Sequence, residues 1–136
     1  MSSSTKKILL VEDNTYVSRM YERAFRLHGY TIDVVSDGEK ALAFLSVTNP
    51  PPAVIVLDVA MPHMNGFELL KRIREQKKFD AVPAIILTNS FSEEASDRFL
   101  SAGADAFFIK INITAKELVE KVESWITQGR STHSSP

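Results

Sequence analysis

Acidic, hydroxyl-bearing and basic side chains directly follow four apolar segments of this chain. They are Glu12, Asp13, Asp58, Thr88 and Lys110. If the apolar segments are strands of one parallel sheet, their carboxyl ends lie at a single edge, which is where open α/β sheets bind ligands. We therefore expect these side chains to lie close together.

The predicted cluster could bind a metal ion and a phosphoryl group. Neighbouring carboxylates repel one another and favour a bound cation, and carboxylate oxygens are ligands that suit Mg²⁺. The Thr88 hydroxyl and the Lys110 ammonium, placed opposite the metal, would stabilise the oxygens of a tetrahedral anion. A free carboxylate beside such an anion can attack phosphorus and form an aspartyl phosphate.

Each of these residues also has an ordinary structural explanation. Asp58 could be satisfied by nearby backbone N–H groups, and Glu12 with Asp13 could stabilise the positive end of a following helix. Thr88 could bond to backbone, and Lys110 could be a solvated surface lysine. Their occurrence at successive strand ends favours a shared functional site over separate explanations.

The elements that would position these residues alternate regularly. Apolar runs of strand length occupy residues 8–11, 54–57, 84–87 and 106–109, and residues 31–35 alternate as in a more peripheral strand. An amphipathic helical segment follows each of the five. Parallel strands require crossover connections, which are right-handed and place helices on both faces of the sheet. The pattern predicts a doubly wound α/β domain with a five-stranded parallel sheet in the flavodoxin-like order 2-1-3-4-5.

Local signals predict where the helices begin and which faces they bury. Asn14 is a candidate N-cap, and capping-box spacing occurs at Ser36 with Glu39, Asn65 with Glu68 and Thr114 with Glu117. We expect the inward faces of the first, fourth and fifth helices to comprise Val17, Met20, Tyr21, Ala24 and Leu27; Ala95, Phe99 and Leu100; and Leu118, Val122, Trp125 and Ile126.

Length and composition indicate one ordinary globular domain. The chain is 44% hydrophobic and 24% charged, its net charge is -1, and it has no cysteine, which excludes disulfides and thiolate metal sites. No apolar run reaches the roughly 20 residues that span a bilayer. We expect a cytoplasmic protein without direct nucleic-acid or membrane binding, composed of a flexible N-terminus over 1–6, a domain over 7–128 and a flexible tail over 129–136.

From about Lys7 to Gln128 the chain resembles the receiver domain of two-component response regulators, the family that includes the bacterial chemotaxis regulator. The resemblance rests on the acidic pair at 12–13, the segment DVAMPHMNG at 58–66, Thr88 and Lys110. It implies that Asp58 accepts a phosphoryl group from a histidine kinase or histidine phosphotransfer protein. It also implies a signalling phosphoacceptor rather than an enzyme, one that assists its own Mg²⁺-dependent phosphorylation and dephosphorylation.

The resemblance implies roles for individual residues. Asp13, Asp58 and the backbone carbonyl of Ala60 would hold Mg²⁺, with Glu12 acting through water. Phe107 lies where the family keeps its aromatic switch residue, which turns inward when the threonine is drawn to the phosphate; plain core packing is the alternative. The expected partners are a kinase or phosphotransfer protein and a downstream target or effector domain, with the chain a monomer or a weak phosphorylation-dependent dimer.

The sequence departs from the family pattern at two positions. Ile111 replaces the proline that usually follows the lysine, and because a non-proline cis bond costs about 2.5–4 kcal/mol, we expect Lys110–Ile111 to be trans. Asn89 replaces a small residue and could narrow access to the phosphoryl site. The positions thought to tune phosphoryl lifetime, Ala60 and Ser90, are small and uncharged.

Other function classes fit the residues less well. A haloacid-dehalogenase-type phosphatase would need a second acid at Ala60, and a nucleotide-binding domain would need glycines after the first strand. The main alternative is a non-phosphorylated pseudo-receiver that acts as a protein-interaction module. Such domains usually lose one of the acids, the threonine or the lysine, whereas this chain keeps all of them.

Overall fold

The computed structural model describes residues 6–60 and 64–130. Its strands are β1 (Lys7–Val11), β2 (Thr31–Val35), β3 (Val54–Asp58), β4 (Ala84–Thr88) and β5 (Ala106–Ile109). Its α-helices are α1 (Thr15–Leu27), α2 (Gly38–Val47), α3 (Gly66–Arg74), α4 (Glu93–Ser101) and α5 (Ala115–Gln128), and short 3₁₀ helices span η1 (Lys77–Phe79) and η2 (Lys110–Asn112). Residues 1–5 of the N-terminus predicted to be flexible over 1–6, and residues 131–136 of the tail predicted over 129–136, lie outside the described residues.

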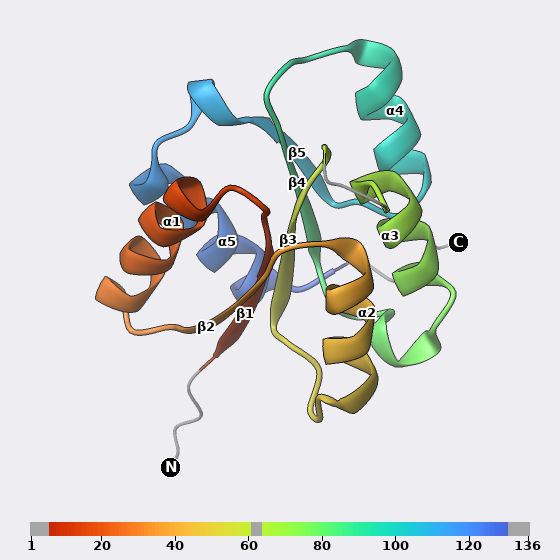
Figure 1. The fold of residues 1–136 in the computed structure, drawn as a ribbon, viewed down its shortest axis with the longest axis horizontal. Coiled ribbons are helices and arrows are strands. Elements are labelled where there is room, and N and C mark those ends of the chain that lie inside the picture. Colours follow the sequence, from red (N-terminus) through yellow and green to blue (C-terminus); the bar gives the residue numbers. More distant parts are fainter. Residues whose placement is uncertain (1–5, 61–63, 131–136) are drawn as a thin grey trace.

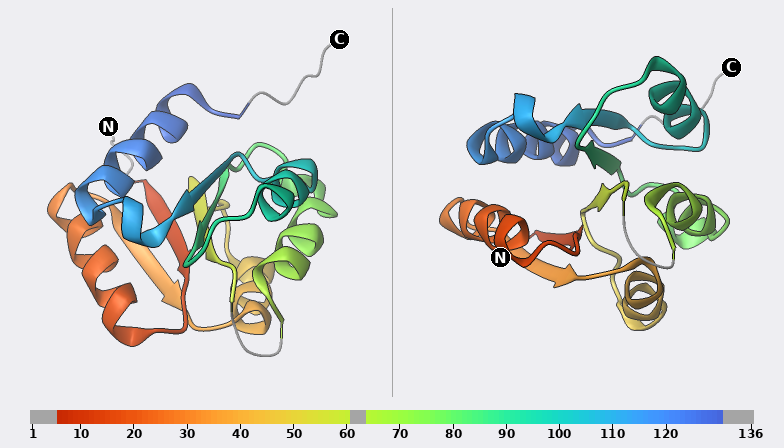
Figure 2. Two further views of the ribbon diagram at one scale, coloured as in Figure 1. Left: turned by 90° about the horizontal axis from the view of Figure 1, so that it is seen from above. Right: turned by 45° about the horizontal axis from the view of Figure 1, so that its top comes forward.

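The strands form one parallel sheet in the order β2-β1-β3-β4-β5. This is the predicted flavodoxin-like order, with β3 at the centre. Helices α1 and α5 lie on one face of the sheet, and α2, α3 and α4 lie on the other (Figure 1). Figure 2 shows the same two layers from above and from an oblique angle. The predicted fold class is therefore confirmed.

Alternation along the central strands sends neighbouring side chains into two different cores. Leu9, Ile55 and Leu57 belong to the core under α2, α3 and α4. Leu10 and Val56 belong to the core under α1 and α5. Every residue of β3 is buried, as expected for a strand covered on both faces. Because side chains alternate with a period of two, Glu12 and Asp58 continue the rows of Leu10 and Val56.

Helix caps agree with the sequence at three helices and differ at one. The side chains of Asn14 and Asn65 accept hydrogen bonds from the first turns of α1 and α3, and Thr114 forms the predicted capping box with Glu117. At Asn65 only the cap bond is found among the described residues, without the reciprocal bond from Glu68. The capping box predicted from Ser36 to Glu39 was wrong. Asp37 caps α2, because its extended backbone directs its carboxylate to the Lys40 N–H at 2.8 Å.

Two predicted helix faces need correction. Tyr21 is buried as expected, but Met20 and Leu27 of α1 are 46% and 76% exposed, whereas Phe25 is fully buried. Tyr21 and Phe25 are one turn apart and therefore share a stripe that Leu27 cannot join. Leu100 of α4 is likewise 44% exposed, although Phe99 is buried. The predicted inward faces of α1 and α4 were too wide because they were assigned from hydrophobicity alone. Exposed leucines and methionines are common on protein surfaces.

A cluster of charged side chains lies at the sheet edge opposite the carboxyl ends of the strands. Arg74 donates to the carbonyls of Gly103, Phe79 and Val82 and contacts Asp105 at 3.2 Å. Arg130, which falls in the range predicted to be a flexible tail, donates from Nε to both Asp105 carboxylate oxygens at 2.9 and 3.0 Å. These bonds connect the end of α5 to the loops around β4 and β5.

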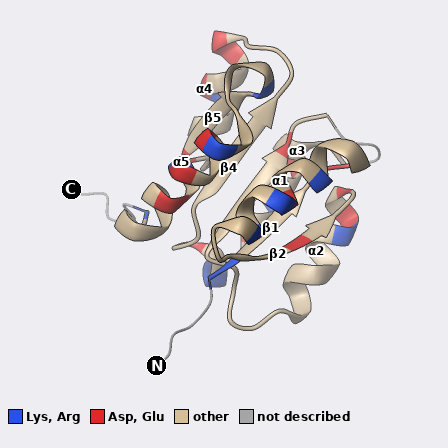
Figure 3. Cartoon of the chain, turned by 90° about the vertical axis from the view of Figure 1, so that its left-hand side faces the viewer, with Lys and Arg blue, Asp and Glu red and all other residues tan. Residues whose placement is uncertain are grey.

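The remaining charges are mixed in sign. Figure 3 shows acidic and basic residues interspersed along the helices on the side that faces the viewer. Within the described ranges, no helix is long and apolar enough to cross a bilayer. Asn49–Pro50 is the one cis peptide bond found among the described residues, so Lys110–Ile111 is trans, as predicted.

Candidate functional site at the carboxyl edge of the sheet

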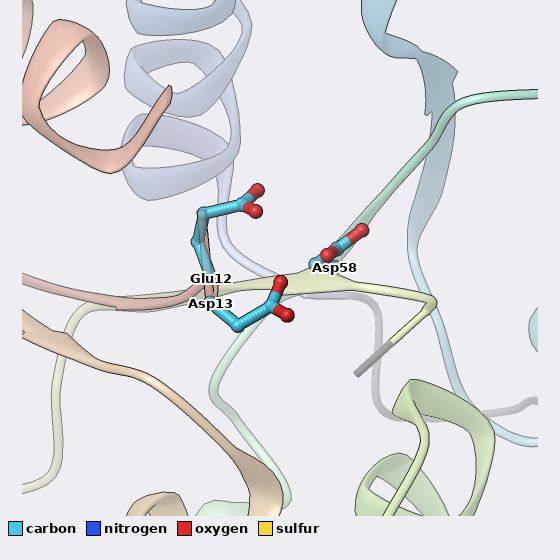
Figure 4. A group of neighbouring side chains, drawn as sticks. All are labelled: Glu12, Asp13 and Asp58. Atoms are coloured by element: carbon cyan, nitrogen blue, oxygen red, sulfur yellow. The ribbon is translucent and has the colours of Figure 1, made fainter. Parts of the chain in front are cut away.

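The three predicted carboxylates converge at the ends of β1 and β3. One oxygen each from Glu12, Asp13 and Asp58 lies within 4.8 Å of the others. In Figure 4 the Asp13 and Asp58 carboxylates point into a common space, with the Glu12 carboxylate nearby. Glu12 and Asp58 are 2% and 4% exposed, while Asp13 is open to solvent. Adjacent strand ends, paired through Val11 and Leu57, therefore position a compact, partly buried acidic site.

Lys110 bridges the two buried carboxylates. Its ammonium lies 2.8 Å from Glu12 Oε1 and 3.1 Å from Asp58 Oδ1. The backbone N–H of Asn14 donates to the other Glu12 oxygen at 3.1 Å. Lys110 reaches the site from η2, although the proline usual after this lysine is absent and the bond to Ile111 is trans. Its long, flexible side chain spans the distance from η2 to the two carboxylates.

Burial and charge shift the titration of the paired groups in the same direction. Burial raises the pKa of Glu12 above its ordinary value, and this effect outweighs the hydrogen bond from Lys110. Burial alone would lower the pKa of Lys110, but the hydrogen bond to Glu12 and the charge of Asp58 raise it overall. Two buried carboxylates thus share one ammonium, and the negative charge left over favours a further cation.

Thr88 lies at the end of β4, next to β3, and its side chain is bonded within its own loop. The hydroxyl donates to the Ser90 carbonyl at 3.0 Å, and the Ser90 N–H approaches Thr88 Oγ1 at 3.3 Å. Thr88 is 7% exposed, so its hydroxyl occupies a sheltered position near the acidic site. Among the described residues, the Thr88 hydroxyl bonds to Ser90 and not to Asp58.

Phe107 lies on β5 within an aromatic row. Its ring is 5.7 Å from the ring of Phe99 and 6.4 Å from that of Phe91. Phe99 in turn contacts Phe67 of α3 edge to face at 5.4 Å. Phe107 and Phe108 point to opposite faces of the sheet, as adjacent residues of a strand do. The row connects the candidate switch position to α3 and α4.

The loop after β3 depends on Gly66, which the Asn65-Gly66 pair marks as a turn in the sequence. The Gly66 N–H donates to the Val59 carbonyl at 2.9 Å, which brings the start of α3 back against the end of β3. A Cβ on Gly66 would lie 2.5 Å from the Asp58 carbonyl oxygen and 3.1 Å from the Val59 Cα. Close approach of backbone to backbone is a common reason for glycine.

This arrangement has the donor set of a divalent-cation site beside an anion site. The carboxylates supply hard oxygen ligands, and the described Ala60 follows directly on the same strand end. Lys110 and Thr88 supply a cation and a hydroxyl at the neighbouring strand ends. Oxygen ligands, a cationic donor and a nucleophilic carboxylate are the groups that phosphoryl transfer to a side chain requires.

Comparison with known proteins identifies the family of the chain. The sequence profile of the response regulator receiver domain matches residues 8–123, which include every residue of the site. The chain belongs to this receiver-domain family. It is thus a receiver domain of the two-component response regulator type, and its five-stranded fold is the one found in other receivers.

Named relatives of this receiver domain come from diverse organisms. "Two-component response regulator ARR3" of Arabidopsis thaliana is 31% identical over 94% of this chain and 58% of its own length. "Probable methanogenesis regulatory protein FilR2" of Methanothrix harundinacea is 31% identical over 91% of this chain and 86% of its own. The chain spans only 15% of the "Gliding motility regulatory protein" of Myxococcus xanthus, which is 32% identical in the matching part.

Solved receiver structures superpose over nearly the whole domain. The Francisella response regulator 1452 receiver domain gives a TM-score of 0.82 at 29% identity, covering 91% of this chain and 98% of the other. The chemotaxis response regulator CheY4 of Vibrio cholerae gives 0.81 at 28% identity, covering 89% and 98%.

Proposed function

We propose that this receiver domain is a phosphoacceptor in a two-component phosphorelay, with Asp58 as the residue that accepts the phosphoryl group. The observation that carries the proposal is the convergence of Glu12, Asp13 and Asp58 with Lys110 at one sheet edge. The donor is a phosphohistidine of a histidine kinase or phosphotransfer protein, and the phosphorylated domain acts on a downstream target or effector domain.

In the reaction an Asp58 carboxylate oxygen attacks phosphorus, and the bond from phosphorus to the donor nitrogen breaks with its electron pair leaving on that nitrogen. Lys110, already 3.1 Å from Asp58, neutralises one oxygen of the transferred group. The Thr88 hydroxyl gives up its hydrogen bond to the Ser90 carbonyl and donates to a second oxygen of the transferred phosphoryl group. Glu12 keeps Lys110 oriented through the 2.8 Å contact.

A divalent cation fits the remaining part of the site. Asp13, Asp58 and the Ala60 carbonyl would hold Mg²⁺, with Glu12 acting through water. Bound there, Mg²⁺ would neutralise charge that develops on the phosphoryl oxygens. The excess of buried carboxylates over cations in the described site favours such an ion. The domain is a signalling phosphoacceptor that assists its own phosphorylation and dephosphorylation rather than an enzyme acting on other substrates.

Switching would follow from the movement of Thr88. Once its hydroxyl donates to the phosphoryl group, the β4–α4 loop loses a hydrogen bond and Phe107 turns inward. The affected surface comprises β5, α4 and α5. A population shift of this kind is limited by the differential contact energy, typically about 1–3 kcal/mol for allosteric coupling.

Incubation with acetyl phosphate and Mg²⁺ tests this function without a cognate kinase. We expect intact-mass analysis to show one added phosphoryl group per chain, because the site holds its nucleophile, cation and donors together. The modification should require a divalent cation and should be removed by hydroxylamine, which cleaves acyl phosphates. A chain that stays unmodified under conditions that modify another receiver would favour the pseudo-receiver.

A further inference from the structure

Phe91 contacts one of the two switch residues, Phe107, and directly follows Ser90, which is hydrogen-bonded to the other, Thr88. It lies in the loop between β4 and α4, and its ring meets the Phe107 ring edge to face at 6.4 Å and an interplanar angle of 76°. Phe91 is 55% exposed, so core packing alone does not account for an aromatic residue at this position. The described loop therefore places an aromatic ring directly over Phe107.

The same loop also holds the Thr88 side chain. Thr88 donates its hydroxyl proton to the Ser90 carbonyl at 3.0 Å, and the Ser90 N–H approaches the same hydroxyl oxygen at 3.3 Å. Ser90 directly precedes Phe91. A hydroxyl has a single proton to donate, so Thr88 cannot bond a phosphoryl oxygen and the Ser90 carbonyl with it at once. Movement of Thr88 therefore releases the backbone that carries Phe91.

Phe107 has a second aromatic neighbour that differs from Phe91 in burial. Phe99 is 4% exposed, lies 5.7 Å from Phe107 and is anchored by Phe67 at 5.4 Å. Arg98 covers the Phe67 ring at 4.2 Å. Phe99 is thus fixed in the core, whereas Phe91 belongs to a solvent-exposed loop. Of the two aromatic neighbours, Phe91 is the one whose contact can be broken without opening the core.

We propose that Phe91 is a positioning residue of the switch, which clamps Phe107 in the unphosphorylated state and is released when Thr88 leaves Ser90. This inference rests on the proposed function and extends it, since it assigns the resting position of the switch to a residue outside the phosphoryl site. The clamp opposes phosphorylation because its contact with Phe107 must be given up on switching. Removing the ring should therefore favour the switched state.

Titration with beryllofluoride and Mg²⁺, a mimic of the phosphoryl group, measures the clamp. We expect Phe91→Ala to lower the beryllofluoride concentration at the titration midpoint by about 2- to 10-fold. This range corresponds to the interaction free energy of one aromatic pair. Phe91→Tyr keeps the ring edge and should restore the wild-type midpoint. The matched control is Leu100→Ala, which shortens another exposed apolar side chain, within α4. An unchanged or higher midpoint in Phe91→Ala would overturn the proposal.

A second measurement needs no mimic and separates the two proposals. In the protein without phosphodonor or mimic, three-bond NMR scalar couplings report the side-chain rotamers of Thr88 and Phe107. Phe91→Ala should average both sets of rotamers, because the loop that holds them has lost its anchor. A single Thr88 rotamer identical to wild type would show that Phe91 only packs locally and would overturn the clamp. If wild type fails to respond to beryllofluoride, the phosphoacceptor function fails, while the rotamers still decide the role of Phe91.

Discussion

Replacement of Asp58 by asparagine should reduce phosphoryl incorporation from acetyl phosphate to background. An amide lacks the anionic oxygen that attacks phosphorus. The same change should stabilise the metal-free protein by about 1 kcal/mol, because it removes one of the carboxylates that repel each other around Lys110. The amide oxygen can still accept from the ammonium. Intact mass and urea unfolding without divalent cations measure the two effects.

The control for this change is Asp97→Asn, which removes an exposed carboxylate of α4. It should leave both incorporation and stability near wild-type values. Incorporation that persists in Asp58→Asn would place the acceptor at another residue. A loss of stability in metal-free Asp58→Asn would mean that its contact with Lys110 outweighs the repulsion among the carboxylates.

Lys110→Met should destabilise the metal-free protein by roughly 1–3 kcal/mol at neutral pH, since it leaves buried acceptors without their donor. The loss should depend on pH. The pKa of Glu12 is already raised by burial, and removal of Lys110 raises it further, so the folded state binds the proton more tightly than the unfolded chain. The penalty is therefore absent below the unfolded pKa and grows as the pH rises through the folded pKa.

Urea unfolding at about pH 4 and at pH 7 measures this dependence, with the pH 4 value near the unfolded glutamate pKa. Lys121→Met removes an exposed lysine of α5 and serves as the control. Mg²⁺ should recover part of the lost stability at pH 7, because it replaces the missing positive charge. Equal losses at both pH values would show that Lys110 acts through packing of its aliphatic stem.

The residues of the site could be predicted because each follows a strand that is almost wholly apolar. Once Ile8 to Val11 and Val54 to Leu57 are read as buried parallel strands, their ends must share an edge, and so must the acids that follow. The trans geometry of Lys110–Ile111 followed from the cost of a non-proline cis bond alone. These predictions depend on backbone rules that hold regardless of side-chain packing.

Features set by packing were not predicted. The capping of α2 by Asp37 instead of Ser36 depends on the path by which the chain leaves β2. The exposure of Leu27 and the burial of Phe25 depend on how α1 is rotated against the sheet. The contact between Asp105 and Arg130 joins residues 25 positions apart, and no local pattern marks it.

The spread of amide chemical shifts on beryllofluoride binding tests the central claim most directly. If Asp58 is the acceptor of a switching domain, shifts in the presence of Mg²⁺ should extend from Asp58 and Thr88 to Phe107, Phe99 and the inward side of α5 around Leu118. The aromatic row and the shared sheet give the physical route for that extension. Shifts confined to the immediate surroundings of Asp58, or absent altogether, would contradict the account and favour a pseudo-receiver.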